Sequence, residues 1–260
     1  MPSERQTSQF TEPLAPDHLV RDVDHEKRDP PAERIATAHL RQPPDFIIIG
    51  TQRGGTTSLY QYLGVHPDVG RAYRKEVHYF DRYFENGIDW YMAHFPVRGK
   101  FRVVGEASPF YIFHPKAPER IQAAKLQSKF ILLLRNPVDR AYSQYHSKVE
   151  RELETLSFAE AIEREPARLA VCDDPVGPAW RHHSYLARGI YIDQIKRWFD
   201  CFSRDRFLIV KSEEFYGEPV GILHQTQAFL GLRPQSPVKF KVHHQADYVE
   251  MDPSVRRRLI

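Results

Sequence analysis

Asp45–Leu59 reads DFIIIGTQRGGTTSL, and this stretch decides the fold. Its apolar run at residues 46–49 is typical of a strand buried on both faces of a parallel sheet. A glycine-containing turn follows at residues 50–55, and Thr56 opens a run with helical character. The positive end of a helix attracts anions, so a strand, a glycine turn and a helix start can hold a phosphate. We therefore predict that this turn binds a phosphorylated nucleotide.

The turn departs from a Walker phosphate loop at one position. Gly50 and Gly55 match the two glycines of that motif, but Thr56 occupies the place of its lysine. Backbone N–H groups and the hydroxyls of residues 56–58 can still hold a phosphate, and Arg53 supplies a cation from within the turn. A glycine turn that merely connects strand to helix is the alternative interpretation of this motif alone.

Further strands and helices alternate along the chain. Continuous apolar runs predict strands at 102–106, 130–134 and 206–210, and 260 residues of 41% hydrophobic composition suffice for one good-sized core. Alternating strands and helices imply βαβ units, so we predict an α/β fold with a central, mostly parallel sheet flanked by helices. The helices are expected at 56–65, 115–124, 138–149, 158–165, 185–202 and 219–230.

The character of the chain changes at residue 45. Residues 1–44 contain seven prolines among many charges and show no sustained apolar period, which predicts a flexible, proline-rich arm. One folded domain is then expected at 45–260, with a carboxyl-terminal helix that starts at Pro253 and looks truncated. Cys172 and Cys201 lack metal-type spacing, and we expect free thiols in a reducing compartment.

Charge and hydropathy argue against several classes of protein. The formal net charge of +3 is too small to indicate a general polyanion binder, so no nucleic-acid partner is expected. The sequence has no run of 18 apolar residues and no signal-peptide start, which predicts a cytoplasmic enzyme without a transmembrane segment. The pairs His182–His183 and His243–His244 have no suitably spaced third ligand, and no metal is expected. The oligomeric state is left open.

A second basic cluster follows the strand predicted at 130–134. Arg135 stands at the carboxyl end of this strand, where open α/β sheets bind ligands. Pro137 suits the first turn of the next helix, which places Ser143 two turns further on. Arg135 and Ser143 could both reach a second phosphate, and a structural ion pair is the alternative for Arg135. Arg140 is expected to face solvent or an acidic neighbour.

A Walker-type magnesium site is not evident. Such a site needs an Asp at the end of a second strand, whereas the strand at 130–134 ends in Arg135. Glu106, which closes the strand at 102–106, is the one substitute. This arrangement favours a donor whose charge is neutralised by arginines and helix ends without a metal.

Candidate chemistry lies in the segment 75–81, which reads KEVHYFD. In an extended segment, Glu76 and His78 would point to the same side. A carboxylate beside an imidazole can take a proton from an attacking hydroxyl, and burial among the neighbouring aromatic rings is expected to raise the pKa of Glu76. The alternative is a surface ion pair of Glu76 with Lys75 or Arg74.

Four motifs together resemble the sulfotransferases that use 3'-phosphoadenosine 5'-phosphosulfate, and they are most similar to the heparan sulfate O- and N-sulfotransferases. In chain order they read QRGGTTSL at 52–59, KEVHYFD at 75–81, GEASPFY at 105–111 and LRNPVDRAYS at 134–143. The resemblance implies a P-loop NTPase-like sulfotransferase fold. It also implies sulfuryl transfer to the hydroxyl of a carbohydrate, glycolipid or small metabolite, with 3'-phosphoadenosine 5'-phosphate as product and no metal required.

The resemblance further implies roles for individual residues. Glu76 would be the catalytic base, with His78 as its rival, and His78 and Asp81 would support the acceptor site. Arg135 and Ser143 would bind the 3'-phosphate. Arg53 would stabilise the leaving oxygen, and the 5'-phosphosulfate loop would consist of Arg53, Gly54, Gly55, Thr56, Thr57 and Ser58.

The chain departs from this family pattern at several points. Arg53 replaces the usual loop Lys and is too weak an acid to give the leaving oxygen a proton. Ala107 replaces a substrate-binding Lys of the heparan-type enzymes, which leaves the acceptor open. The late segment at 243–248 has neither their disulfide pair nor their Lys-Gly-Arg clamp.

Arg188–Tyr191 could contact the nucleotide or only begin a helix.

Two other classes of function compete with the resemblance. A P-loop kinase or NTPase is disfavoured by Thr56 and by Arg135 at the strand end. A catalytically silent nucleotide-binding module is disfavoured by the intact segment that carries Glu76 and His78. Magnesium dependence of nucleotide binding would separate a kinase from a sulfotransferase.

Overall fold

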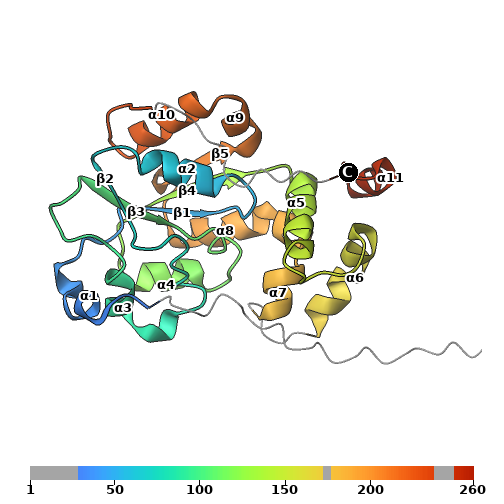
Figure 1. The fold of residues 1–260 in the computed structure, drawn as a ribbon, viewed down its shortest axis with the longest axis horizontal. Coiled ribbons are helices and arrows are strands. Elements are labelled where there is room, and N and C mark those ends of the chain that lie inside the picture. Colours follow the sequence, from blue (N-terminus) through green and yellow to red (C-terminus); the bar gives the residue numbers. More distant parts are fainter. Residues whose placement is uncertain (1–28, 172–176, 237–248) are drawn as a thin grey trace, which may run out of the picture.

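The protein is described from a computed structural model that covers residues 29–171, 177–236 and 249–260. These residues form one five-stranded sheet (Figure 1). Its strands are β1 (Phe46–Gly50), β2 (Val69–Arg71), β3 (Val103–Ala107), β4 (Lys129–Leu134) and β5 (Phe207–Lys211). The spatial order is β2-β3-β1-β4-β5, and each neighbouring pair is parallel. The predicted α/β fold is confirmed.

The strands follow the apolar runs of the sequence. All five residues of β1 are buried, as are all five of β3, because both strands lie inside the sheet and are covered on both faces. The predicted strands match β1, β3, β4 and β5 to within one residue at each end. The edge strand β2 was not predicted, because three residues offer no apolar run long enough to recognise.

Helices alternate with these strands along the chain and include all six helical segments expected from the sequence. The structure adds four short helices, α1, α3, α7 and α9, to that set. The bounds are α1 (Ala32–Ala36), α2 (Thr56–Leu63), α3 (Ile88–Met92), α4 (Ala117–Ala123), α5 (Pro137–Val149), α6 (Phe158–Ala170), α7 (Pro178–His183), α8 (Tyr191–Cys201), α9 (Ser212–Gly217), α10 (Pro219–Phe229) and α11 (Pro253–Leu259).

The helices pack on both faces of the sheet (Figure 1). On one face, side chains of α2, α9 and α10 form an apolar core with the sheet. On the other face, side chains of α3, α4 and α8 form a second core, which is rich in aromatic rings. A third cluster joins α5 and α6 beyond the end of the sheet. The sheet is thus a buried middle layer, and its strand ends remain as the place for a site.

Two predicted helix boundaries differ from the structure by five residues or more. α6 continues through Pro166 to Ala170 instead of ending at Glu165. The helix predicted at 185–202 begins only at Tyr191, because a 3-10 turn, Ala187–Gly189, precedes it.

The expected flexible arm at 1–44 is partly wrong. α1 and a 3-10 turn, Ala38–Leu40, lie within this segment. The guanidinium of Arg34 donates to the Ala93 and Phe95 carbonyls at 2.7 and 2.8 Å. Arg41, which is buried, also donates to the Phe95 carbonyl, at 3.2 Å. These hydrogen bonds hold the described end of the segment against the domain.

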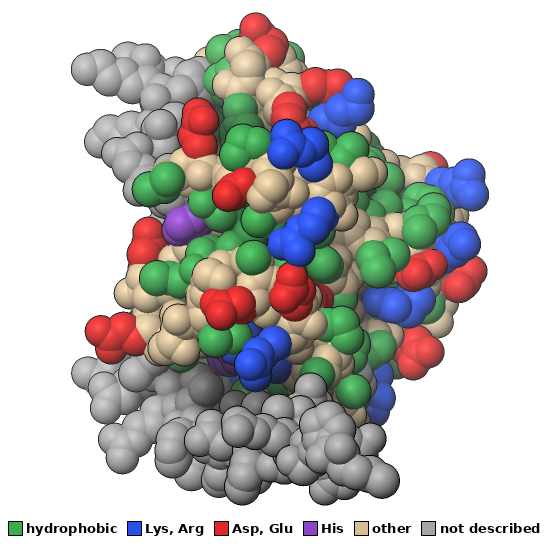
Figure 2. Space-filling model, turned by 90° about the vertical axis from the view of Figure 1, so that its right-hand side faces the viewer, with side chains coloured by type: hydrophobic (Ala, Val, Ile, Leu, Met, Phe, Trp, Pro, Cys, Tyr) green, Lys and Arg blue, Asp and Glu red, His purple; other side chains and the backbone are tan. Residues whose placement is uncertain are grey.

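The face nearest α5, α6 and α11 carries charges of both signs interspersed with apolar side chains (Figure 2). On the part of that face formed by described residues, neither sign gathers into one broad patch. Within the described ranges, no helix combines the length and the apolar character that crossing a bilayer requires. The expected cytoplasmic location stays a prediction.

Candidate active site

The candidate site lies at the carboxyl ends of β1, β3 and β4. Because the strands are parallel, these ends meet at one edge of the sheet. β1 lies between β3 and β4: the chain first adds β2 and β3 on one side of β1 and then crosses to add β4 and β5 on the other side, so the strand order reverses here. Open α/β sheets bind their ligands at such a switch point.

The turn after β1 is fixed to β4. The backbone N–H and the hydroxyl of Thr51 both donate to the Leu133 carbonyl, at 3.0 and 2.8 Å. The Gly54 N–H closes the turn on the Thr51 carbonyl at 3.0 Å. A Cβ at residue 54 would lie only 2.7 Å from the Leu133 oxygen, and Gly55 has a φ of 91°. Both positions therefore favour glycine for steric reasons.

The turn leads directly into α2. Gly55 is the N-cap residue, and the first hydrogen bond of the helix runs from the Leu59 N–H to the Gly55 carbonyl at 3.1 Å. The backbone N–H groups of residues 56–58 therefore lie at the open, positive end of α2. The buried Thr56 and Ser58 belong to this end. The turn thus has the geometry of an anion-binding site.

Two predicted phosphate-binding elements meet beside the turn. The Arg53 Nε donates to the Ser143 Oγ at 2.9 Å across 90 residues of chain. Arg135 donates through Nη1 to the Arg53 carbonyl at 3.1 Å, and the Tyr191 hydroxyl donates to the Arg135 carbonyl at 2.8 Å. Asn136 caps α5 by accepting from the N–H groups of the first turn. The structure brings Arg53, Arg135 and Ser143 together, as the sequence predicts.

Two further arginines are buried behind the turn. Arg188 donates to the Gln52 side chain, and its guanidinium lies 4.6 Å from the centroid of the Phe110 ring. Arg140 is 1% exposed and donates to Gln144 Oε1 at 2.7 Å and to the Tyr185 carbonyl. Burial lowers the pKa of Arg140 to about 10, so it remains charged at neutral pH. The expectation that Arg140 faces solvent is wrong, because these contacts enclose it.

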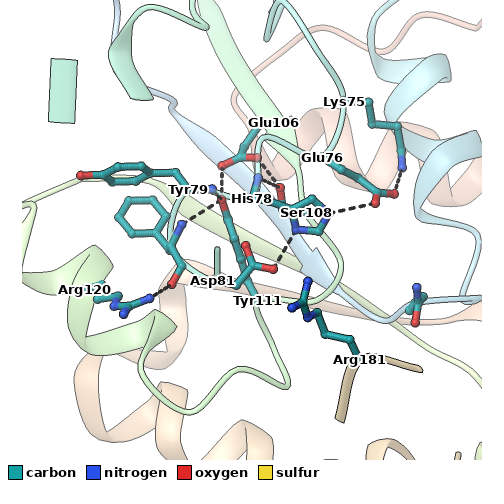
Figure 3. A network of polar contacts seen from close by, with 12 residues as sticks. Lys75, Glu76, His78, Tyr79, Asp81, Glu106, Ser108, Tyr111, Arg120 and Arg181 are labelled. Atoms are coloured by element: carbon teal, nitrogen blue, oxygen red, sulfur yellow. Dashed lines mark hydrogen bonds and ion pairs between the residues drawn. The ribbon is translucent and has the colours of Figure 1, made fainter. Parts of the chain in front are cut away.

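The second group of predicted residues forms a chain of polar contacts (Figure 3). Lys75 Nζ lies 2.5 Å from Glu76 Oε1, and Glu76 Oε2 lies 3.2 Å from His78 Nε2. The other ring nitrogen of His78 lies 2.7 Å from the Asp81 carboxylate. The contact of Glu76 with His78 and the alternative ion pair with Lys75 are therefore both present.

The backbone of this segment is not extended. Glu76 has a φ of 58° and His78 a φ of 55°. Both angles lie in the left-handed region of backbone conformation, which is unfavourable for residues other than glycine. The expected strand-like alternation is wrong. The two side chains meet because the segment turns at each of them, and the Glu76 N–H anchors it to the Ala107 carbonyl at the end of β3, at 3.0 Å.

The charges of these groups affect one another. Burial raises the pKa of Glu76, but the hydrogen bond from His78 and the charge of Lys75 outweigh it and hold this pKa below its usual range. Burial lowers the pKa of His78, but Asp81 and Glu76 raise it, so that the net shift is upward. The expected rise in the Glu76 pKa is wrong, because two cationic partners face a carboxylate that remains 38% exposed.

Glu106 lies directly behind this segment and is fully buried. Its carboxylate accepts from the Tyr91, Ser108 and Tyr111 hydroxyls at 2.9, 2.7 and 3.2 Å. These three groups enclose both oxygens, so Glu106 does not present a free oxygen to a metal–phosphate complex. The sequence-based interpretation of Glu106 as a substitute magnesium ligand is not supported.

His182 and His183 both contact other charged side chains. His182 Nδ1 lies 3.0 Å from Lys148 Nζ, and His183 Nδ1 lies 3.5 Å from the Glu154 carboxylate. Among the residues that the structure describes, no three metal-ligating side chains of the His, Cys, Asp or Glu type gather at one point. Cys201 is a free cysteine. Cys172 and His243–His244 lie outside the described residues.

Sequence reasoning missed the residues behind the candidate base. Ser108 and Tyr111 belong to the third motif, 105–111, but their hydroxyls contact Glu106 and the segment 78–80 only through the fold. The contact of Gln52 with Arg188 spans 136 residues. Such partners have no local sequence pattern, because they lie far apart in the chain and meet only in the folded domain.

This fold and this site define a class of protein: a P-loop-like α/β protein with an anion-binding turn at the switch point of its sheet. The family model described as "Sulfotransferase domain" matches residues 43–251. The chain belongs to the sulfotransferase family, a family of enzymes, and the resemblance of its four motifs is confirmed.

Individual relatives agree with this assignment. The human heparan sulfate glucosamine 3-O-sulfotransferase 6 is 34% identical over 193 residues, which cover 74% of this chain and 54% of the relative. The membrane-associated sulfotransferase kil1 of Dictyostelium discoideum is 26% identical and covers 84% of this chain and 62% of its own length. The chain thus spans little more than half of these curated relatives. A solved sulfotransferase from Alicyclobacillus acidocaldarius is 35% identical with a TM-score of 0.72, covering 84% of this chain and 90% of that one.

Proposed function

We propose that this chain transfers a sulfuryl group from 3'-phosphoadenosine 5'-phosphosulfate to a hydroxyl of a sugar-containing acceptor. One observation carries the proposal: Arg53, Arg135 and Ser143 converge on the anion-binding turn at the end of β1. The donor has two phosphate-bearing positions. A turn with a helix end for one of them, and an arginine–serine pair for the other, fits this distribution of charge.

The site offers this donor cations in place of a metal. Arg135 stands at the end of β4, where a Walker NTPase carries a magnesium-binding acid, and Arg53 lies in the turn itself. Both guanidinium groups can form bidentate hydrogen bonds to phosphate oxygens. These residues therefore fit a donor that binds without a metal, and they fit a magnesium nucleotide poorly. The same observation disfavours a P-loop kinase.

The donor supplies an activated sulfur. In the reaction, the acceptor oxygen forms a bond to that sulfur while the bond between sulfur and the 5'-phosphate oxygen breaks. The residues of the turn, the end of α2 and Arg53 stabilise the charge that grows on the leaving phosphate oxygen. Because a guanidinium keeps its proton at neutral pH, Arg53 acts here through charge and hydrogen bonds.

Glu76 takes the proton of the acceptor hydroxyl. Its lowered pKa keeps it ionised at neutral pH, which is the form in which a carboxylate can accept a proton. The raised pKa of His78 favours the imidazolium form, which cannot accept one. His78 and Asp81 then orient Glu76 and the acceptor. Since Lys75 covers Glu76 Oε1, the incoming acceptor replaces Lys75 at this oxygen.

The names of the relatives support the proposed acceptor class. The human relative is named for transfer to a glucosamine hydroxyl of heparan sulfate. We carry over only the class, a sugar hydroxyl, because Ala107 stands where the heparan-type enzymes place a substrate-binding Lys.

The test is transfer of radiolabelled sulfate from the donor to a panel of mono- and oligosaccharides with EDTA present. We expect label in a sugar product, and none from a matched Glu76→Gln preparation. Label transfer that requires magnesium, or transfer of phosphate from ATP to the same acceptors, would overturn the proposal.

A further inference from the structure

The segment that carries the candidate base rests on a buried set of hydroxyls. The His78 N–H donates to the Ser108 Oγ at 3.2 Å. The Tyr79 and Phe80 N–H groups donate to the Tyr111 hydroxyl at 2.9 and 3.4 Å. Three successive backbone N–H groups thus point at two side-chain oxygens (Figure 3).

These hydroxyls need an acceptor for their own protons. A backbone N–H can only donate, so each hydroxyl oxygen that it contacts must act as an acceptor there. The proton of each hydroxyl is then directed elsewhere. Ser108 directs it to Glu106 Oε2 at 2.7 Å, and Tyr111 directs it to Glu106 Oε1 at 3.2 Å.

Glu106 is the common end point of both paths. It is fully buried at the carboxyl end of β3, where parallel pairing with β1 fixes its backbone. Each carboxylate oxygen serves one path, and Tyr91 donates a third hydroxyl to Oε1 at 2.9 Å. Tyr91 has no hydrogen bond to the segment 78–80 in this network, which makes it a natural control.

We infer that Glu106 is a positioning residue: through the Ser108 and Tyr111 hydroxyls it holds the backbone at 78–80, and thereby sets Glu76 and His78 in their reactive orientation. This role rests on the proposed sulfuryl transfer. The left-handed φ angles of Glu76 and His78 require such support, because a residue outside its favoured backbone region is kept there by its surroundings.

The contacts of Glu106 favour this positioning role over a purely structural role. An apolar side chain would fill the volume of Glu106 at lower desolvation cost, since a buried carboxylate is expensive unless it is fully hydrogen-bonded. Here every partner of the carboxylate is a hydroxyl, and two of the three pass the interaction to the catalytic segment. Arg120 adds a fourth contact from outside the network, donating to the Phe80 carbonyl at 2.7 Å.

The test compares Glu106→Gln, Ser108→Ala and Tyr111→Phe with Tyr91→Phe. An amide at residue 106 can accept along one path only, because its NH₂ group faces the other hydroxyl as a donor. We expect the first three variants to lose about tenfold or more in kcat, since small misplacements of reacting groups carry costs of this size. We expect Tyr91→Phe to retain wild-type kcat, and all four variants to bind 3'-phosphoadenosine 5'-phosphate within about twofold of wild type.

Two readouts separate positioning from a general loss of structure. In a Glu76→Gln background, Glu106→Gln should cause little further loss of kcat, because residues that act through one group are not additive. Amide hydrogen exchange at residues 78–80 should quicken in Tyr111→Phe and Glu106→Gln, and stay as in wild type in Tyr91→Phe. Equal losses in both backgrounds, or unchanged exchange in a folded Glu106→Gln variant, would overturn the inference.

The exchange measurement also separates this inference from the proposed function. It needs no turnover, so it decides whether Glu106 holds the segment even if the wild-type chain transfers no sulfate. Absent transfer by wild type would overturn the proposed function and the catalytic role of Glu106 with it. Normal exchange alongside active wild-type enzyme would overturn the positioning role alone.

Discussion

The two halves of the proposed site, one for the sulfuryl donor and one for the acceptor, are built in different ways. The donor half, at the ends of β1 and β4, consists of a glycine turn, a helix start and arginines, and its main contacts are to backbone carbonyls. The acceptor half, at residues 75–81, has no regular secondary structure and contains two left-handed residues. It depends on side-chain hydroxyls from β3 and the loop after it.

This difference separates binding from turnover. The cations and N–H groups of the donor half attract the anionic groups of the nucleotide. Substitutions in the donor half should therefore mainly weaken nucleotide binding. The acceptor half holds one carboxylate and one imidazole in a defined orientation, so substitutions there should mainly lower kcat.

The largest effect is expected for Glu76→Gln. If Glu76 is the general base, as proposed, its removal should lower kcat by about 10²–10⁴-fold, while the affinity for 3'-phosphoadenosine 5'-phosphate stays within about twofold of wild type. Initial rates and calorimetry measure the two quantities. The exposed Glu85 in the same region offers a matched control, Glu85→Gln, which should behave as wild type. Near-normal turnover of Glu76→Gln would transfer the base role to His78.

The buried Glu106 should give the protein a pH-dependent stability. Burial raises its pKa to about 7, against the hydroxyls of Ser108, Tyr91 and Tyr111 and the charge of His78, which lower it. A pKa raised on folding means that the protonated carboxyl favours the folded state at low pH. The free energy of unfolding should therefore fall between about pH 4.5 and pH 7, by on the order of 3 kcal/mol, as the unfolded chain releases this proton first.

Urea titrations of wild type and Glu106→Gln across this pH range measure that contribution. The difference in unfolding free energy, wild type minus variant, should decline as pH rises and level off above about pH 7. A difference that is flat across the range would mean that Glu106 keeps an ordinary pKa despite its burial.

A smaller effect is expected at Arg135. Arg135→Met removes a charged donor from the end of β4 and should weaken binding of 3'-phosphoadenosine 5'-phosphate by about 10- to 100-fold. Adenosine 5'-phosphate, which lacks the 3'-phosphate, should lose much less affinity. The exposed Arg151 provides the control Arg151→Met. Equal losses for both nucleotides would place Arg135 away from the 3'-phosphate.

The smallest effect is expected at Lys75. Its charge helps to hold the pKa of Glu76 down, so Lys75→Met should raise that pKa. The acid limb of the kcat/KM–pH profile should then move to higher pH, because Glu76 must be ionised to accept a proton. An unchanged or oppositely shifted limb would show that another group controls the profile.

The donor half could be predicted from the sequence because its determinants are local. The apolar run of β1, the glycines at 54 and 55 and the proline that opens α5 each act on their immediate neighbours. Arg53 was placed in the turn after the first strand, Arg135 at the end of the strand at 130–134 and Ser143 two turns into the next helix, and parallel pairing of β1 with β4 brings the two strand ends together.

The acceptor half could be predicted only in part. The residues singled out in the segment KEVHYFD do contact one another, but the alternation rule failed at Glu76 and His78, because tertiary hydrogen bonds override the extended conformation there. The sign of the Glu76 pKa shift was wrong because the effect of Lys75 and His78 exceeds that of burial. The role of Glu106 depends on contacts up to 32 residues apart, between Tyr79 and Tyr111, which no local pattern encodes.

The most direct test of the account is calorimetric titration of the wild-type chain with 3'-phosphoadenosine 5'-phosphate and with ATP, each in EDTA and in magnesium. If arginines and a helix end bind the nucleotide, the 3',5'-bisphosphate should bind with EDTA present and about 10- to 100-fold more tightly than ATP. Its affinity should not rise when magnesium is added. Equal affinity for both nucleotides, or binding that requires magnesium, would contradict the assignment of this turn as a phosphosulfate site.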